Sequence, residues 1–477
     1  MIEALAPTLL ETNLPELGLL RRGKVRDSYV VDGQRYLIAT DRISAFDVVF
    51  AEAIPHKGRV LTEITAFMTE RARRIAPVAM LGRPHPSVMV ARECPTIPIE
   101  VIVRGYLAGS AWQAYERGER ELSGVTLPDG LTKNARLPAP ILTPTTKADE
   151  GHDLPISREH IIARGIVTAR VWAEIERLAL ALFADGSAFA EGRGLILVDT
   201  KYEFGDGGDG APVLIDEVHT PDSSRYWRLA SYAANPADPE PLSKELLRDW
   251  LRARGFTGEA GQAVPPLPRE VIASVSARYL ELCRELIGRE PELATSGDPH
   301  YDVYAALRAN GDLRGFVAIV VCGSPSDTPN ARKVMDTLAL LGVPSVQRIV
   351  SGHRDPKRLI ALVEWVDRYP GDVVWVDVTG LSNAKGPLLA ANTLNPVYHC
   401  AFEPTSPDTL SSLNLPAGVP LAVVAGPRNT ALVVAKQLGV RHEEVRRRVR
   451  QAFADERARG FDADLHQAIV RRPERSP

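Results

Sequence analysis

The sequence predicts an α+β domain followed by an α/β domain with three layers, in which helices cover both faces of a parallel sheet. The chain has 477 residues, and at roughly 100–200 residues per domain this length argues against a single small fold. Up to about residue 222 the apolar runs are short and broken by Gly, Pro and Asp, which is α+β texture. From Phe316 onward, Val/Ile-rich runs alternate with helical patterns, as in a covered parallel sheet.

The composition is that of an ordinary globular protein, with 45% hydrophobic and 25% charged residues. The net charge of −3 is too near neutral for a nucleic-acid binder that relies on a global basic field. Apolar runs such as Phe316–Cys322 fall far short of the ~20 residues that cross a bilayer, and the N-terminus does not resemble a signal peptide. The four cysteines lie far apart, which predicts neither a zinc site nor disulfides. We expect a cytoplasmic protein without nucleic-acid or membrane partners.

The first domain is expected at residues 1–288. Strands are predicted at Ser28–Val31, Arg35–Thr40, Ile99–Val103, Leu195–Thr200, Lys201–Phe204 and Val213–Asp216. Helices are predicted at Ile162–Ala184 and at Pro266–Gly288, where apolar residues recur at three- and four-residue steps. Residues 289–314 are polar and read as a linker, with a short helix over Tyr301–Ala309.

The second domain is expected at residues 315–477. Its predicted strands begin near Phe316, Val346, Val373, Val397 and Leu421. Helices are predicted at Pro329–Leu341 and Asp355–Arg368. The basic run 446–450 near the end suits the solvated face of a terminal helix better than a nucleic-acid patch.

The segment Gly205–Gly210 matches the pattern G-x-G-x-x-G, but a dinucleotide site needs a strand before it and a helix after it. Here a strand is predicted on both sides, so the glycines indicate a hairpin turn. No G-x-x-x-x-G-K-[ST] pattern for a P-loop occurs either.

This hairpin carries carboxylates. Strand alternation places Asp199, Lys201 and Glu203 on one face, and Asp216 returns near Glu203 on the partner strand. Two facing carboxylates repel unless a cation bridges them, and Mg²⁺ favours one or two carboxylates completed by water and phosphate. The alternative is a surface strand of mixed charges, which the spacing alone favours.

Other segments carry groups suited to phosphate. Gly lets the backbone approach an anion, and Lys or Arg donates charge-assisted hydrogen bonds. Such residues stand at Gly23, Lys24 and Arg26, at Arg104 and Ser110, at Arg225, and at Lys147 in the polar segment 143–151. A basic turn before a strand is commonplace, and Ser110 could equally cap a helix over Ala111–Tyr115.

In the second domain, three successive predicted strands are each followed by a polar, Gly-rich segment. A turn between a strand end and a helix start offers N–H groups to an anion, and ligands of open parallel sheets gather at the carboxyl ends of strands. The residues are Gly323, Ser324, Ser326 and Asp327 after the first strand, Ser351, His353 and Arg354 after the second, and Ser382 and Asn383 after the third. A single His after a strand is more often structural, but here it accompanies two such loops.

Six motifs in order across residues 22–227 resemble the SAICAR synthase family of purine biosynthesis. They read R-G-K-V-R-D, T-D-R-I-S-A-F-D, V-I-V-R-G-Y-L-A-G-S-A-W, T-P-T-T-K-A, D-T-K-Y-E-F-G and D-E-V-H-T-P-D-S-S-R-Y-W. SAICAR is phosphoribosylaminoimidazole-succinocarboxamide. The resemblance covers about residues 14–287 and implies a two-lobed, ATP-binding domain. Such a domain phosphorylates the carboxylate of carboxyaminoimidazole ribonucleotide (CAIR) and joins it to L-aspartate.

The resemblance also implies roles for individual residues. It implies ATP phosphates cradled by Gly23, Lys24, Val25 and Arg26; Mg²⁺ held by Glu203 and Asp216; Lys147 and Lys201 near the transferring phosphoryl group; and the CAIR phosphate held by Arg104, Ser110 and Arg225. Phosphoryl transfer agrees with this set, because it needs positioning and positive charge more than a covalent catalyst.

The strand-end turns of the second domain, over about residues 316–440, resemble aminoimidazole ribonucleotide (AIR) carboxylase. The segment from Ser382 to Pro387 matches S-N-x-x-G-P of the class that takes CO₂ directly, whereas Gly352, Leu381 and Arg354 depart from that class. His353 matches the family's His, a side chain suited to proton transfer near neutral pH. The resemblance implies that the other eight turn residues named above, from Gly323 to Asn383, bind AIR and CO₂.

Together the two resemblances imply a bifunctional enzyme whose second domain makes CAIR and whose first consumes it. The alternative is a SAICAR synthase with a degenerate, oligomerising second domain. A phosphotransferase acting on another carboxylate is a more distant alternative. The carboxylase resemblance implies an octamer.

Overall fold

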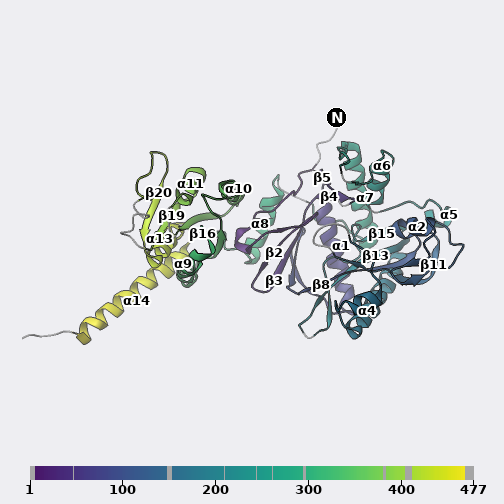
Figure 1. The fold of residues 1–477 in the computed structure, drawn as a ribbon, viewed down its shortest axis with the longest axis horizontal. Helices are drawn as coiled ribbons and strands as arrows, with labels where there is room; N and C mark the ends of the chain where they lie inside the picture. Colours follow the sequence, from purple (N-terminus) through teal and green to yellow (C-terminus); the bar gives the residue numbers. More distant parts are fainter. Residues whose placement is uncertain are drawn as a thin grey trace, which may run out of the picture. The chain divides into compact units, whose positions relative to one another are not determined.

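The computed structural model describes residues 6–46, 48–147, 153–208, 210–242, 244–259, 261–293, 297–379, 383–402 and 411–467. The chain divides into two compact units, shown in Figure 1. Unit 1 comprises Met1–Thr12 and Leu19–Leu307, and unit 2 comprises Asn13–Gly18 and Arg308–Pro477. Within the described ranges, no helix is long and apolar enough to cross a membrane.

Unit 1 contains two larger antiparallel sheets. The first has the order β1-β2-β3-β7-β6. Its strands are β1 (Arg21–Arg22), β2 (Arg26–Val31), β3 (Gln34–Ala39), β7 (Val88–Arg92) and β6 (Met80–His85). The hairpin β2–β3 and its neighbour β7 form one wall of the cavity described below.

The second sheet is built around β13 (Leu195–Asp206), the longest strand of unit 1, in the order β11-β8-β13-β14. The other strands are β8 (Thr96–Tyr106), β11 (Arg136–Leu142), β12 (Thr145–Thr146), β14 (Pro212–Ile215) and β15 (Ser224–Arg228). Two small hairpins pair β4 (Arg42–Ala45) with β5 (Val48–Ala53) and β9 (Glu121–Leu122) with β10 (Val125–Thr126). These antiparallel sheets with flanking helices confirm the predicted α+β class.

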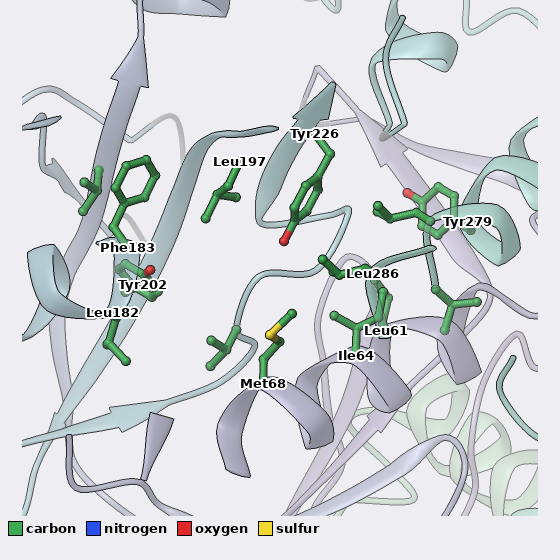
Figure 2. Packing of buried hydrophobic residues seen from close by; sticks show 14 of the residues in the cluster. Leu61, Ile64, Met68, Leu182, Phe183, Leu197, Tyr202, Tyr226, Tyr279 and Leu286 are labelled. Atoms are coloured by element: carbon green, nitrogen blue, oxygen red, sulfur yellow. The ribbon is translucent and has the colours of Figure 1, made fainter. Parts of the chain in front are cut away.

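Helices cover these sheets and bury one core. They are α1 (Lys57–Ala72), α2 (Gly109–Glu116), α3 (Arg158–Ala163), α4 (Ala169–Glu191), α5 (Leu229–Ala234), α6 (Glu245–Arg252) and α7 (Arg269–Ile287). Figure 2 shows Leu61 and Met68 of α1, Leu182 of α4, Tyr202 of β13 and Tyr279 of α7 in the same cluster. Tyr202 and Tyr279 are both 0% exposed, so β13 is fixed by the core on one face while its other face is free to carry charge.

The single helix predicted at Ile162–Ala184 is wrong, because the structure contains two helices here, α3 and α4. Gly165 has a φ of +66°, and Thr168 caps α4 by accepting a hydrogen bond from the backbone N–H of Val171 at 3.3 Å. The apolar periodicity runs on across the break, which conceals it in the sequence. The helix predicted at Pro266–Gly288 is confirmed as α7, which ends at Gly288 in the left-handed conformation.

Unit 2 contains a five-stranded parallel sheet with the order β17-β16-β18-β19-β20. Its strands are β16 (Phe316–Cys322), β17 (Ser345–Ile349), β18 (Asp372–Val378), β19 (Val397–Ala401) and β20 (Leu421–Ala425). All seven residues of β16 are buried, as a strand covered on both faces requires. The predicted parallel sheet is confirmed.

Two pairs of packed helices flank this sheet, α9 with α13 and α10 with α11. The helices of unit 2 are α9 (Thr328–Leu340), α10 (Pro356–Asp367), α11 (Lys385–Asn392), α13 (Pro427–Gly439) and α14 (Glu443–Gln467). Alternate residues of β16, including Ala318 and Val320, share a core with α9 and α13. Strand alternation turns Val317 and Ile319, equally buried, to the other face. The described part of the domain therefore has the predicted three layers. The helix α8 (Pro299–Asn310) matches the one predicted in the linker.

A short segment near the start of the chain packs on unit 2. Leu14 and Leu17 are 0% and 1% exposed. The carboxylate of Glu16 accepts hydrogen bonds from the backbone N–H groups of Arg314 (2.6 Å) and Gly315 (2.9 Å) and from the Tyr369 hydroxyl. Burial raises the pKa of Glu16. The sequence pattern assigned this segment to the first domain.

Candidate active sites

A cavity of about 260 Å³ opens in unit 1, and its lining combines apolar and charged side chains. The apolar lining residues include Leu37, Ala79, Ala91 and Ile215. The remaining lining residues are Gly23, Arg26, Ser28, Arg35, Arg92, Cys94, Thr96, Lys147, Glu203 and Asp216. Four separate sequence motifs thus meet in one cavity, which suits a flat apolar ring joined to phosphates.

The Gly23–Arg26 segment connects β1 and β2. The backbone N–H of Gly23 donates to the carbonyl of Arg26 at 2.7 Å, which closes a tight turn. Gly23 and Arg26 line the cavity, whereas Lys24 and Val25 do not. The Val25 carbonyl accepts from the backbone N–H (3.1 Å) and hydroxyl (2.8 Å) of Thr40. The structure therefore does not bring the side chains of Lys24 and Val25 to the wall of this cavity.

Glu203 lies between two ammonium groups. Lys147 donates to one of its oxygens, and Lys201 donates to the other at 2.9 Å while also donating to Glu100 at 2.5 Å. Burial alone would raise the pKa of Glu203, but Lys201 and Lys147 outweigh it and lower the pKa to about 2. Glu203 is therefore an anion at any physiological pH, and only Lys147 of the two lysines reaches the cavity wall.

The strand register places Ile215, and not Asp216, opposite Glu203. Asp216 follows the end of β14 with a φ of +62°, a left-handed conformation that is uncommon outside glycine. Its carboxylate pairs with the guanidinium of Arg26, which also contacts Glu217 at 2.7 Å. Glu203 and Asp216 thus line the same cavity without being direct cross-strand neighbours.

This donor set fits a divalent cation. Both carboxylates reach one cavity and both are matched by positive charge, which a cation bound with phosphate would partly replace. In the described residues, no group of three or more His, Cys, Asp or Glu side chains forms a metal site. Two carboxylates leave the remaining coordination positions to water and phosphate, which is the arrangement Mg²⁺ prefers.

A second charged cluster surrounds Asp199. Arg104 donates to Asp199 at 2.9 Å and to the Thr143 hydroxyl at 2.8 Å, and its other terminal nitrogen lies 3.4 Å from the Ser110 hydroxyl. Arg225 lies 3.5 Å from the same Asp199 oxygen. Burial lowers the pKa of Arg104, as does the proximity of Arg225. The structure therefore brings the three predicted phosphate ligands together, with two guanidinium groups sharing one carboxylate.

Ser110 does not cap a helix. Helix α2 begins at Gly109, its N-cap residue is Ala108, and no side chain makes a capping hydrogen bond. Gly109 has a φ of +58°, and a Cβ there would lie 2.1 Å from the guanidinium of Arg225. The glycine is required both by its backbone conformation and by the close approach of this arginine.

The turns of unit 2 also meet. Asp327 accepts hydrogen bonds from the backbone N–H groups of Gly323 (2.9 Å) and Ser324 (3.0 Å), so its carboxylate shapes the turn. The hydroxyls of Ser324 and Ser326 lie 2.5 Å apart. Arg354 connects two turns, because it contacts the carbonyl of Gly323 and the hydroxyl of Ser351, each at 3.4 Å.

The remaining predicted residues of this site behave differently from one another. His353 is exposed beside Arg354. Asn383 is buried, and its amide is used internally: its nitrogen donates to Ser412 at 3.0 Å, and its oxygen accepts from the backbone N–H of Gly386 at 2.8 Å. The prediction for Ser382 lies outside the described residues.

Sequence reasoning missed a buried polar cluster beneath these turns. Asp377 pairs with Lys385 and lies 2.7 Å from the Nδ1 atom of His399. It placed Asp199 on the charged face of the hairpin but did not predict its pairing with Arg104, and it missed Glu217, which contacts Arg26. The signal in each case is a charged residue inside an apolar strand or buried motif, which needs a partner that the local sequence does not reveal.

The comparisons with known proteins identify both units. Residues 19–263 match the family model of SAICAR synthetase, and residues 317–459 match that of AIR carboxylase. The phosphoribosylaminoimidazole-succinocarboxamide synthase of Cytophaga hutchinsonii is 50% identical over 277 residues, covering 57% of this chain and 89% of that protein. The one from Bacteroides fragilis is 47% identical over 290 residues, covering 60% and 92%. SAICAR synthase from Saccharomyces cerevisiae, solved with SAICAR, shares 33% identity with a TM-score of 0.53, covering 59% of this chain and 99% of that one.

The fold and the sites define a two-domain enzyme for phosphorylated substrates. The chain belongs to the SAICAR synthetase family, and it carries an AIR carboxylase domain after the synthetase domain. The chain thus combines a ligase and a lyase that serve two steps of de novo purine biosynthesis.

Proposed function

We propose that the cavity of unit 1 binds ATP, with the purine against its apolar lining residues and the phosphates toward Arg26 and Lys147. The observation that carries this proposal is that Gly23, Arg26, Lys147, Glu203 and Asp216, from separate motifs, line one cavity. The side chains of Arg26 and Lys147 supply the positive charge that a triphosphate needs. Lys201 acts on the transferring phosphoryl group through Glu203, which it holds ionised.

The reaction joins CAIR to L-aspartate in two steps. A carboxylate oxygen of CAIR attacks the γ-phosphorus of ATP, which forms an acyl phosphate and releases ADP. The aspartate amine then attacks the acyl carbon, the C–O bond to phosphate breaks, and the amine loses a proton as the amide forms. The protein contributes positioning and charge, because phosphoryl transfer requires little covalent catalysis.

Glu203 and Asp216 would hold Mg²⁺ through their carboxylates. When bound, the ion supplies neutralisation of charge on the ATP phosphates. Arg26 contacts both Asp216 and Glu217, and so keeps this loop in place. The cluster of Arg104, Ser110 and Arg225 would bind the CAIR phosphate, since two guanidinium groups around a single carboxylate retain donors for a second anion.

In unit 2, the turns at Gly323, Ser351 and Asn383 would bind AIR, and CO₂ would be its co-substrate without consumption of ATP. The nucleophilic ring carbon of AIR attacks CO₂, and the ring then loses the proton from that carbon to regain aromaticity. His353 would accept this proton, because it is exposed beside the turns that approach each other through Arg354. The Asn383 amide would shape its turn, since its donors and acceptor face the interior.

We also propose the octameric state that the carboxylase resemblance implies. Light scattering on the purified chain measures the mass directly, and a monomer at micromolar concentration contradicts this proposal.

The overall proposal is tested by supplying AIR, bicarbonate with dissolved CO₂, ATP, Mg²⁺ and aspartate and identifying the products by mass. SAICAR is expected, with one ADP per SAICAR. Leaving out aspartate should stop SAICAR formation but not CAIR formation. If ADP forms at the same rate when both aspartate and AIR, the source of CAIR, are left out, the chain phosphorylates a different acceptor and the assignment fails.

A further inference from the structure

A buried charged cluster lies beneath the carboxylase turns, and none of the proposed catalytic roles uses it. Asp377 is 0% exposed, Lys385 2% and His399 3%. They come from the end of β18, the start of α11 and β19. Burying charges in an otherwise apolar sheet is costly, and a buried ion pair is commonly no more stabilising than well-packed apolar residues of the same size. Stability alone therefore does not account for this cluster.

The Lys385 ammonium has three acceptors. It donates to a carboxylate oxygen of Asp377, to the carbonyl of Val321 at 2.8 Å and to the carbonyl of Val378 at 3.4 Å. An ammonium group has three donors, so its capacity is fully used. Burial pulls the pKa of Lys385 down, but these acceptors, one of them a carboxylate, favour the charged form. Its side chain thus links α11 to the ends of β16 and β18.

The same lysine lies against two further turns. A Cβ at Gly352 would fall 2.8 Å from the Cα of Lys385, and a Cβ at Gly323 would fall 3.9 Å from its Cε. Gly352 therefore packs directly on the Lys385 backbone. The turns that follow β16 and β17 and the start of α11 all meet at this residue.

His399 extends the cluster toward Asn383. Its Nδ1 atom lies 2.7 Å from Asp377 and 3.2 Å from the Asn383 amide nitrogen. Burial and the nearby Lys385 ammonium lower the pKa of His399 to about 4, so the ring is neutral near pH 7. The Nδ1–H group of the neutral ring then donates to Asp377, whose carboxylate is shared between Lys385 and His399, and the Asn383 turn lies against this ring.

We propose that Lys385, held by Asp377, is a positioning residue of the carboxylase: it fixes the Gly323, Gly352 and Asn383 turns relative to one another so that they bind the nucleotide. This rests on the proposed binding of AIR at these turns. Lys385 does not touch the substrate, because its donors are fully used and it is buried. Its loss should act mainly on the KM for AIR, since proton transfer belongs to His353.

The test separates stability from positioning. Lys385→Met leaves the Asp377 carboxylate without its ammonium partner, so unit 2 should melt at a clearly lower temperature. Lys385→Met combined with Asp377→Asn removes both charges, and its melting temperature should recover most of that loss. The double variant should nevertheless have a kcat/KM for AIR at least tenfold below that of the unaltered chain, with the KM carrying most of the change. Thr430→Val is the control variant. It removes a buried hydroxyl of unit 2 outside the Asp377–Lys385 cluster and should keep its carboxylase activity.

A double variant with recovered melting temperature and a kcat/KM within twofold of the unaltered chain would show that the pair only packs. Should the double variant not fold, Asp377→Asn alone decides, because its lysine keeps both carbonyl acceptors. That variant should lose between twofold and tenfold in kcat/KM, with the KM carrying most of the change. A folded variant within twofold of the unaltered chain would show that the pair only packs, and a loss of tenfold or more would assign the role to the carboxylate instead. SAICAR synthesis from added CAIR should stay unchanged throughout. If the unaltered chain does not carboxylate AIR while His353→Asn behaves identically, the proposed function fails first, and this inference falls with it.

Discussion

The guanidinium of Arg225 lies so close to Gly109 that a Cβ at position 109 would fall 2.1 Å from its Nη1 atom. Gly109 also has a φ of +58°, which side-chain-bearing residues rarely adopt. The first residue of α2 and an arginine of β15 are thus fitted to each other, although more than a hundred residues separate them in the sequence.

Gly109→Ala should therefore displace Arg225 and weaken CAIR binding. We expect the KM for CAIR to rise at least tenfold while the KM for ATP changes less than twofold, because the ATP cavity does not include this turn. Gly118→Ala is the matched control, since Gly118 also has positive φ but would contact nothing within 4 Å. Equal effects of the two substitutions would show that backbone strain, and not Arg225, is responsible.

Arg104→Met and Arg225→Met should each weaken CAIR binding more than ATP or aspartate binding. Hydrogen bonds to a charged group contribute about 1.5–3 kcal/mol, which corresponds to roughly 10- to 150-fold in KM. Steady-state kinetics with each substrate varied in turn measures the effect. A rise in the KM for ATP with an unchanged KM for CAIR would mean that the two phosphate sites have been exchanged.

His353→Asn should lower carboxylation by about 10²–10⁴-fold, the range for loss of a general base. The exposed position of His353 makes misfolding an improbable cause of such a loss, and circular dichroism checks it. SAICAR synthesis from added CAIR should be unaffected. N5-carboxylated AIR consumed in CO₂-depleted buffer at the rate seen with AIR and CO₂ would contradict the CO₂ assignment.

His219 should make the stability of unit 1 depend on pH. Its ring contacts the Tyr202 hydroxyl at 2.5 Å, and burial lowers its pKa to about 4. The unfolded chain binds this proton near pH 6.5 but the folded chain does not, so stability is lost as the pH falls from 6.5 toward 4, by on the order of 3 kcal/mol.

Comparing melting temperatures of the unaltered chain and His219→Gln at pH 8 and pH 5 checks this expectation. The variant should be less stable at pH 8 because it loses the contact with Tyr202. The difference between the two melting temperatures should shrink at pH 5. At that pH the unaltered chain is destabilised, because its unfolded form binds a proton on His219 that the folded form does not. A difference that stays constant or grows would contradict the assignment.

Much of the fold followed from local pattern. The continuous Val/Ile run of β16 predicted a strand covered on both faces, and the hairpin around Gly205–Gly210 followed from strands on both sides. The break between α3 and α4 did not follow, because Gly165 interrupts an apolar periodicity that continues in phase. The docking of Glu16 on unit 2 was equally hidden, since its partners Arg314, Gly315 and Tyr369 are distant in sequence.

The candidate sites show the same division. The sequence motifs predicted Arg26, Glu203 and Asp216 as site residues, and the structure brings them to one cavity. Only the β13–β14 register shows that Ile215 lies opposite Glu203. The buried pair of Asp377 and Lys385 could not be predicted, because its remaining acceptors are backbone carbonyls of two different strands. Charge pairing over long sequence distance is set by topology, which local periodicity does not encode.

Asp216→Asn should abolish SAICAR formation and leave carboxylation intact, because the variant loses one of the two carboxylates proposed to hold Mg²⁺. Added Mg²⁺ should not restore the activity. Asp206→Asn, on the same hairpin but outside the cavity, is the control and should be close to normal. Near-normal SAICAR synthesis by Asp216→Asn at saturating Mg²⁺ would remove Asp216 from the proposed metal site.

Mixing two variants tests most directly that one chain carries two separate active sites. With AIR, CO₂, ATP, Mg²⁺ and aspartate, Asp216→Asn alone should stop at CAIR, and His353→Asn alone should leave AIR largely unconsumed. An equimolar mixture should make SAICAR at a rate well above the sum of the two. A mixture no faster than that sum, with each variant folded and with His353→Asn still converting added CAIR, would contradict the account of two independent sites.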